Sequence, residues 1–207
     1  MTLLVDECRW PWRGRLWCHL VSDNHLNELH AFARRLALPR RAFQGDHYDL
    51  DEVLRGHAVA LGAEPVPSRE LLARLRGAGL RLSPAQRRQR DRESPVRLPP
   101  EEWVGRRVEV QVDHPYGSPL YSGARSTVNL GHVPGTAGWG RLPLAAYVLG
   151  PAGPVTRASG TVVAVLRRHD DVEDRLAVAT GHRWDVAAIA AAVAGHERWF
   201  ASEVLTV

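Results

Sequence analysis

Residues Asn129 to Gly150 read NLGHVPGTAGWGRLPLAAYVLG, and a second run, Arg167 to Ala179, reads RRHDDVEDRLAVA. Each run ends in a short apolar segment, Ala146 to Gly150 and Leu176 to Ala179, with the length and residue types of a strand. The glycines and prolines of the first run mark turns. We therefore predict that the C-terminal half of the chain is built from short strands joined by loops.

Other segments of this half fit the same interpretation. Val108 to Val112 alternates apolar and polar residues with period two, and Thr161 to Leu166 is a further short apolar run. Asp185 is typical of a helix N-cap, because its side-chain oxygen can accept a free backbone N–H. We expect the terminal helix to pack on the strands through an apolar face made of Ile189, Val193, Trp199 and Phe200.

The half from about residue 106 to residue 204 resembles the soluble, magnesium-dependent inorganic pyrophosphatases. That family carries an Asn-Tyr-Gly-Tyr turn followed by Val/Ile-Pro-x-Thr, and Asn129 to Thr136 reads Asn-Leu-Gly-His-Val-Pro-Gly-Thr. The resemblance implies an α+β domain, a small β-barrel of the oligonucleotide-binding type with a C-terminal helix.

The same resemblance implies a damaged active site. In the family, carboxylates from several strands hold magnesium ions, and basic side chains grip phosphate oxygens. The matching acidic positions here hold Gln111, Gly140, Leu142 and Ala145, and the active-site tyrosine position holds Leu130. The resemblance thus implies a catalytically degenerate module.

One acidic run of the family survives. By the resemblance, its carboxylates would hold a single hydrated magnesium ion, and they are Asp170, Asp171, Glu173 and Asp174. Arg125 and Arg175 stand where phosphate-gripping lysines would be, and arginine binds phosphate in a planar, bidentate manner. The alternative interpretation of the acidic run is a solvated hairpin turn.

The N-terminal half alternates strands and helices, which predicts a small α/β domain. Leu3 to Val5 and His19 to Asp23 read as strands, and Asp23 or Asn24 can cap the helix that follows. Two more helices are predicted, one from Asp51 to Leu61 and one capped by Ser68 and closed at Gly77. The triplet His47-Tyr48-Asp49 is expected in a loop or at a strand end.

These features, over about residues 1 to 76, resemble a family of short uncharacterised domains. Its pattern includes Cys-His-Leu at Cys18 to Leu20, Glu-Leu-His at Glu28 to His30, His-Tyr-Asp at His47 to Asp49 and Gly-Ala at Gly62 and Ala63. That family implies a domain but no activity.

Four polar residues of this domain are our candidates for a reactive or ligand-binding centre: Asp6, His19, His47 and Asp49. Strands that end at Asp6 and begin at His19 can converge on the His47–Asp49 segment. Two carboxylates and two imidazoles can bind a divalent metal or share a proton. A hydrogen-bonded structural network is the alternative.

All 27 basic residues are arginine, and the formal net charge is +4. Arginine, glutamine, serine and proline dominate residues 81–100, which predicts a linker; the predicted domains are 1–80 and 105–207, with residues 81–104 between them. The alternative for the Arg87 to Arg92 cluster is a contact with a polyanion.

The N-terminal domain also contains three tryptophans beside arginines, Trp10, Trp12 and Trp17. They are compatible with nucleic-acid binding, although tryptophans in small domains commonly belong to the core.

The sequence contains no apolar run of the roughly 18 residues that span a bilayer and no signal peptide, so we expect a cytoplasmic protein without a membrane contact. Cys8 and Cys18, the two cysteines, fit neither a disulfide framework nor a thiolate zinc site, and we expect free thiols.

Three functions compete. The first is a two-domain protein with a degenerate pyrophosphatase-like scaffold that binds a phosphate-containing small molecule or forms a homo-oligomer. The second is a magnesium-dependent hydrolase of pyrophosphate or another phosphoanhydride. The third is an N-terminal module that binds or processes nucleic acid.

We expect the purified protein to hydrolyse pyrophosphate far more slowly than an active pyrophosphatase, because Gln111, Gly140, Leu142 and Ala145 cannot bind cations. A steady-state phosphate-release assay with magnesium measures this. Turnover of roughly 1 to 1,000 per second, the ordinary enzymatic range, would contradict the degenerate interpretation.

Overall fold

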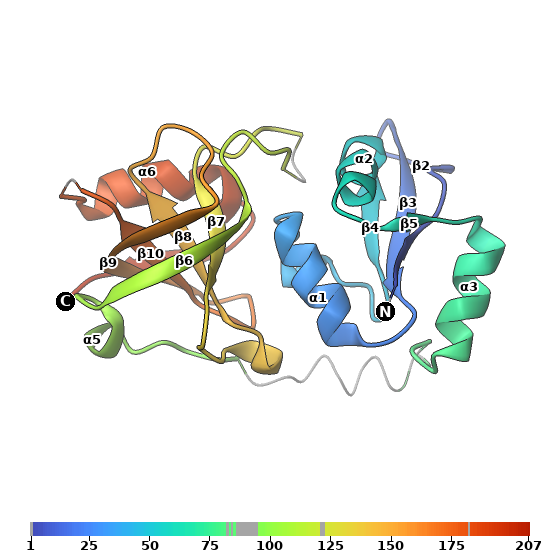
Figure 1. Cartoon of the computed structure of the whole chain (residues 1–207), viewed down its shortest axis with the longest axis horizontal. Coiled ribbons are helices and arrows are strands. Elements are labelled where there is room, and N and C mark those ends of the chain that lie inside the picture. The colour runs from blue at the N-terminus through green and yellow to red at the C-terminus, as the bar shows by residue number, and fades with distance from the viewer. Residues whose placement is uncertain (1, 82, 84, 86–94, 121–122, 182) are drawn as a thin grey trace. The chain divides into compact units, whose positions relative to one another are not determined.

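The structure is a computed structural model that describes residues 2–81, 83, 85, 95–120, 123–181 and 183–207 (Figure 1). These residues form two compact units, which we describe separately. Residues 2–81, 83, 85 and 123 belong to the N-terminal unit, and the remaining described residues belong to the C-terminal unit. None of the helices in the described part of the chain has the length and apolar character that crossing a membrane requires.

The N-terminal unit is built around strand β3, Arg15–Ser22, which is paired along both edges. On one edge it pairs antiparallel with β2, Trp10–Trp12, and then with β1, Leu3–Val5. On the other edge it pairs antiparallel with β4, Tyr48–Asp51. A short strand, β5 at Glu64–Pro65, continues the sheet parallel to β1.

Helices cover both faces of this sheet. Helices α1, Leu26–Arg35, and α2, Glu52–Ala60, belong to the larger apolar core, which takes Cys18, Leu20 and Leu50 from the strands. On the opposite face Leu4 and Val21 pack against helix α3, Ser68–Gly77. Because side chains alternate along a strand, the odd-numbered residues of β3 point to the α3 face.

Two expected helix caps have other partners in this unit. Helix α1 is capped by His25, whose ring accepts the Asn27 N–H, whereas Asp23 accepts hydrogen bonds from the Arg74 guanidinium. Ser68 makes no cap; its hydroxyl donates to Asp6. Of the two alternatives for the His47-Tyr48-Asp49 triplet, the structure has the strand end, because β4 begins at Tyr48. A single 3-10 turn, η1 at Arg40–Ala42, precedes it.

The C-terminal unit is a closed five-stranded β-barrel. Its strands are β6 at Arg107–His114, β7 at Asn129–Val133, β8 at Leu144–Leu149, β9 at Arg157–Arg168 and β10 at Arg175–Ala179. The order β10-β8-β7-β6-β9 closes because β10 also pairs with β9. All pairs are antiparallel except β8 with β10. The mixed α/β class and the barrel with a C-terminal helix are thus present.

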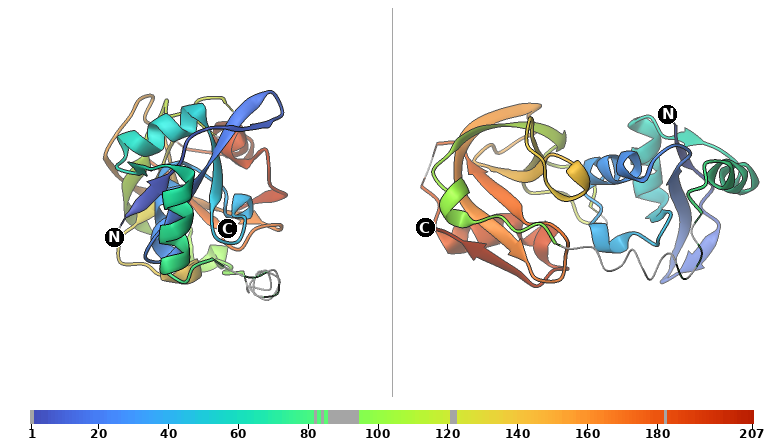
Figure 2. Two further views of the ribbon diagram at one scale, coloured as in Figure 1. Left: turned by 90° about the vertical axis from the view of Figure 1, so that its right-hand side faces the viewer. Right: turned by 90° about the horizontal axis from the view of Figure 1, so that it is seen from below.

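Smaller elements complete the barrel unit. Strand β11, Ser202–Leu205, pairs with β9, and two short turns, α5 at Pro100–Trp103 and η2 at Trp139–Arg141, lie in the connections. Helix α6, Val186–Glu197, is capped by Asp185 as expected and lies against the barrel wall in Figures 1 and 2. It ends before Trp199 and Phe200, so these two residues are not part of its apolar face.

The barrel wall has an apolar inner face and a partly polar outer face. Inside, the core includes Val110, Val148, Val165, Leu176 and Val178. The alternate residues of the same strands point to the outer face of the barrel, part of which α6 covers. Several of these outward residues are buried and polar, namely Tyr147, Arg168 and Arg175. The expected apolar contact of α6 is therefore limited to Ile189 and Val193.

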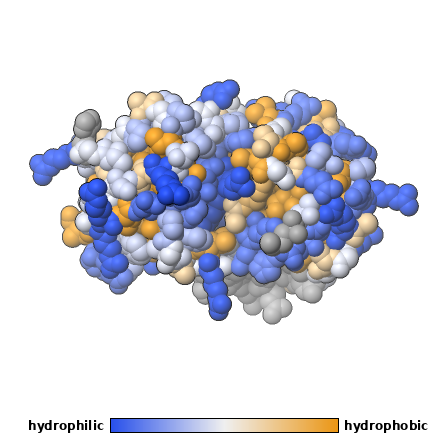
Figure 3. Space-filling view, viewed as in Figure 1, coloured by the Kyte–Doolittle hydropathy of each residue, from blue (hydrophilic) through white to orange (hydrophobic). Residues whose placement is uncertain are grey.

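Part of the expected linker contacts the barrel. Leu98 is buried in the barrel core, and Val96 forms a bridge with Glu173. Arg81 pairs with Asp46 of the N-terminal unit. The Arg87 to Arg92 cluster lies outside the described residues. Hydrophilic residues are spread over the face of the molecule shown in Figure 3, with hydrophobic residues in separate patches between them.

Gly131 of β7 marks a close approach between barrel strands. A Cβ atom at this position would lie 2.0 Å from the backbone oxygen of Gln111 on β6. Only glycine therefore lets β6 and β7 pair with this register. Gly153, in a loop of the same unit, has no atom within 4 Å of such a Cβ.

We expect Gly131→Ala to lower the free energy of unfolding of the barrel by at least about 2 kcal/mol, because the two strands must separate to admit the methyl group. Gly153→Ala is the matched control and should change it little. Guanidinium denaturation followed by tryptophan fluorescence measures both. Equal stabilities of the two variants would show that the strands do not approach this closely.

Candidate functional site

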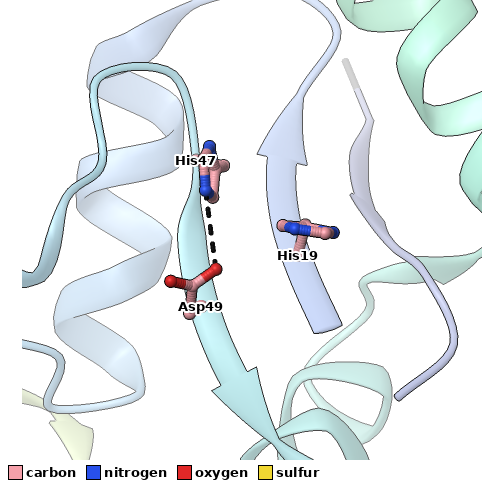
Figure 4. Close-up of side chains that lie close together, drawn as sticks. All are labelled: His19, His47 and Asp49. Carbon is pink, nitrogen blue, oxygen red and sulfur yellow. Dashed lines mark ion pairs between the residues drawn. The ribbon is translucent and has the colours of Figure 1, made fainter. Parts of the chain in front are cut away.

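Strand register gathers three polar side chains on the α3 face of the N-terminal sheet. His19 of β3 lies directly opposite Asp49 of β4, and His47 precedes Asp49 by two residues, so the three side chains share one face. One ligand atom from each of the three lies within 4.8 Å of the other two. Figure 4 shows Asp49 on β4, His47 just before that strand and His19 on the neighbouring β3.

Asp6 fixes the orientation of His19. It lies at the break between β1 and β2 and is only 1% exposed. Its Oδ1 accepts the backbone N–H of His19 at 2.6 Å, and its Oδ2 lies 3.1 Å from the ring Nδ1. An ionised carboxylate only accepts hydrogen bonds, so Nδ1 carries a proton, and in the neutral ring the lone pair lies on Nε2. The Ser68 hydroxyl donates to the same Oδ2 at 2.7 Å.

Asp46 holds His47 in the same way. Its Oδ1 lies 2.7 Å from His47 Nδ1, and Asp46 is fully buried. On the other side of the ring, Nε2 lies 3.5 Å from Asp49 Oδ1. Arg81 reaches Asp46 Oδ2 at 3.2 Å. Each histidine therefore has a buried carboxylate at Nδ1, and the Nε2 of His47 is directed to the neighbouring Asp49.

These contacts shift two ionisation equilibria. Burial alone would raise the pKa of Asp6, but hydrogen bonds from His19 and Ser68 outweigh it, and the pKa lies below its ordinary value. Burial alone would lower the pKa of His47, but its hydrogen bonds with Asp46 and Asp49 raise the pKa to about 9. The site therefore keeps Asp6 ionised, and a metal ion at His47 must displace a proton.

Two cavities adjoin the triad. The larger, of about 500 Å³, is lined by the three triad residues, Gln44 and the tryptophans Trp10, Trp12 and Trp17. The smaller, of about 320 Å³, extends toward α3, with Asp6, His19, His47 and Ser68 on its polar side and leucines of α3 on the other. Volumes of this size suit a small ligand.

The triad offers ligand types that transition metals bind. Two imidazoles and one carboxylate form a three-ligand set that leaves coordination positions open. Metal-binding histidines commonly donate their second N–H to a carboxylate, which fixes the ring and raises its basicity. Asp6 and Asp46 provide such a carboxylate at the Nδ1 atoms of His19 and His47. The same arrangement can also transfer protons, with His19 as the base.

The structure brings together the four residues that the sequence singled out, but in two roles. His19, His47 and Asp49 form the triad, whereas Asp6 lies behind His19. Sequence reasoning missed Asp46 and Ser68. Asp46 could have been found from its position directly before the His-Tyr-Asp motif. Ser68 was missed because a serine at the start of a helix is typical of a helix cap.

The carboxylates of the barrel's acidic run contact arginines and backbone N–H groups. Among the described residues, Asp170, Asp171, Glu173 and Asp174 provide no group of three that could share an ion. Asp171 pairs with Arg168 at 3.0 Å, and Asp174 accepts from Arg97 at 2.8 Å and from the Leu98 N–H. Asp170 accepts the Ala201 N–H. Arginines and backbone donors thus take up the oxygens that a magnesium ion would need.

The expected phosphate ligands have other surroundings. Arg125 donates to the Gly117 carbonyl at an exposed site. Arg175 is 3% exposed, and its Nη1 donates to the Tyr147 hydroxyl at 3.1 Å. That hydroxyl donates to Glu197, which also accepts from Arg168 at 2.6 Å. Arg175 belongs to a buried network between the barrel wall and α6 rather than to an open anion site.

Comparisons with known proteins match a family model to the N-terminal half and find similar solved structures. Residues 3–78, in the N-terminal half, match the model of a family described as "Protein of unknown function (DUF4031)". In the comparison with curated proteins, no sequence matches the chain. Among solved structures, an inorganic pyrophosphatase from Ehrlichia chaffeensis is similar, with 14% identity and a TM-score of 0.41, over 55% of this chain and 90% of that chain.

The network under α6 predicts a pH dependence of stability. His196 is buried, with its Nε2 2.7 Å from the Ser126 hydroxyl. Burial, then Arg175, His114 and Arg168, lower the pKa of His196 well below its ordinary value of 6.5. Below about pH 6.5, His196 is protonated in the unfolded chain but stays neutral in the folded chain. The free energy of unfolding therefore falls as the pH drops below about 6.5.

We expect His196→Gln to remove about 1 kcal/mol of the stability that the protein loses between pH 7.5 and pH 5.5. Denaturant titrations at the two pH values measure it. His169→Gln, at an exposed histidine of the same unit, is the control. If wild type and His196→Gln lost equal stability on acidification, His196 would not be held neutral.

Proposed function

We propose that this protein binds one divalent transition-metal ion in its N-terminal unit, through His19, His47 and Asp49. The observation that carries the proposal is the buried carboxylate behind each imidazole: Asp6 at 3.1 Å from His19 Nδ1 and Asp46 at 2.7 Å from His47 Nδ1. Such pairs fix both the tautomer and the direction of a metal-binding ring.

The residue types favour a transition metal over magnesium. Magnesium prefers oxygen ligands and an octahedral shell of waters, whereas imidazole nitrogen suits zinc, iron, cobalt, nickel and copper. We therefore propose a transition metal at the N-terminal triad, whereas the resemblance of the barrel to pyrophosphatases implied a magnesium ion.

Open coordination positions on the metal would let the site bind water or a substrate. A metal with three protein ligands can bind water and lower its pKa toward neutrality, or polarise a ligand oxygen. The triad residues line the larger cavity, so a small molecule there can reach the metal. We therefore propose metal-assisted hydrolysis as the reaction class of the site.

For the barrel we propose a non-catalytic role as a scaffold. This is supported by the neutral residues at the acidic positions of the pyrophosphatase pattern and by the arginines that pair with Asp171 and Asp174. Both cysteines are free thiols, which supports a reducing compartment such as the cytoplasm.

We expect isothermal titration with zinc to show one high-affinity site, which His47→Ala and His19→Ala each abolish because each removes one of three ligands. His132→Ala is the matched control: His132 also has a carboxylate at Nδ1, from Asp113, but it is not part of the triad. It should bind zinc as wild type does.

A second variant separates metal binding from simple destabilisation. Asp46→Asn keeps all three ligands but weakens the support of His47, and we expect zinc affinity to fall by about 10- to 100-fold. Wild-type protein that binds no zinc, or zinc binding that survives His47→Ala, would overturn the proposal.

A further inference from the structure

We infer that the ligand of this centre is a nucleotide, whose base stacks on the tryptophans of the β2–β3 hairpin while its phosphate reaches the metal. The inference rests on the proposed metal site and names the class of molecule it serves. It starts from one observation: the cavity of about 500 Å³ has three tryptophans on one side and all three triad residues on the other.

Strand register makes this arrangement a consequence of the fold. Trp10 pairs with Trp17 across the hairpin, and paired residues point to the same face of a sheet. Trp12, two residues from Trp10, joins them by alternation. Because His19 lies two residues after Trp17 on β3, the tryptophans and the proposed metal ligands form one continuous surface.

Ring contacts link the two parts of that surface. The Trp10 ring lies 6.1 Å from the His19 ring in an edge-to-face arrangement, and the rings of Trp12 and Trp17 are 5.4 Å apart. The indole N–H of Trp17 donates to the Trp12 carbonyl at 2.9 Å, which fixes the Trp17 ring. Trp17 is buried, whereas Trp10 and Trp12 are each 53% exposed. Packing within the unit therefore leaves two indole rings accessible to a flat partner.

A positive charge lies beside the tryptophans. The guanidinium of Arg13, at the hairpin turn, lies 4.4 Å from the centre of the Trp12 ring. A bound metal ion adds positive charge at the other end of the cavity. A nucleotide combines the two features that this surface offers to bind, a flat aromatic base and an anionic group.

A sugar is another partner that stacks on tryptophan. Sugar hydroxyls need many hydrogen-bonding side chains, and apart from the triad residues the cavity lining provides one amide, Gln44. An aromatic base needs few such groups, because stacking alone contributes about 1–3 kcal/mol per base. The lining therefore favours a nucleotide.

The test uses the full-length protein loaded with zinc. Its probes are a fluorescein-labelled single-stranded oligodeoxythymidylate, followed by anisotropy, and thymidine monophosphate as an unlabelled competitor. We expect the oligonucleotide to bind and Trp12→Ala to weaken it by at least about tenfold, the loss of one stacked base. Trp12→Phe should retain most of the affinity.

The matched control is Trp199→Ala in the barrel unit. Trp199 is also exposed, at 42%, and carries the Arg198 guanidinium 4.7 Å from its ring centre. It should bind the oligonucleotide as wild type does. Competition by the monophosphate at similar concentration would identify a free nucleotide as the ligand, and its failure would identify a strand; both outcomes support the inference.

Zinc titration of the same variants separates the two proposals. Trp12→Ala should bind zinc normally, because no ligand is removed. If the zinc-loaded protein binds neither nucleotide probe, or binds a maltooligosaccharide instead, the nucleotide inference is overturned while the metal site stands. If Trp12→Ala and Trp199→Ala weaken binding equally, the hairpin is not the binding surface and the inference is also overturned.

Discussion

Asp6 accepts hydrogen bonds that connect three parts of the N-terminal unit. Its buried carboxylate accepts from the backbone and ring of His19 on β3 and from Ser68 at the start of α3, while its own carbonyl accepts from Arg55 of α2. A buried carboxylate is costly unless its oxygens are satisfied, and here the satisfied state also fixes the His19 ring. The orientation of Nε2, and with it the geometry of the triad, depends on this set of bonds.

The sequence predicted the strands and helices that periodicity and caps make visible. The pattern correctly places the strand Leu3–Val5 and the two helices that begin after Asp51 and Asp185. Lone caps were harder to assign, because Asp23 and Ser68 have polar partners, Arg74 and Asp6, that are distant in sequence. Local residue preference cannot reveal such partners, since only the tertiary fold brings them close.

The sequence predicted which residues of the candidate site lie close together but not their separate roles, because those roles depend on strand pairing. The four candidates come from strand ends and one motif, and strand convergence was enough to expect them near one another. Their division into proposed metal ligands and supporting residues depends on the register that sets His19 opposite Asp49. In the barrel, the resemblance pointed to Arg175 and the acidic run, but only the tertiary fold determines which charges pair there. Arg168, buried and bonded to Glu197 and Asp171, took no part in the sequence argument.

The account depends most directly on whether a metal ion occupies the space between His19, His47 and Asp49. A crystal structure of the protein grown with zinc, with anomalous data collected above the zinc absorption edge, measures this. The account predicts one anomalous peak at roughly 2.0–2.2 Å from the Nε2 atoms of both histidines and from an Asp49 oxygen, with Asp6 and Asp46 still bonded to the Nδ1 atoms. No peak there, or a peak only on other residues, would contradict it.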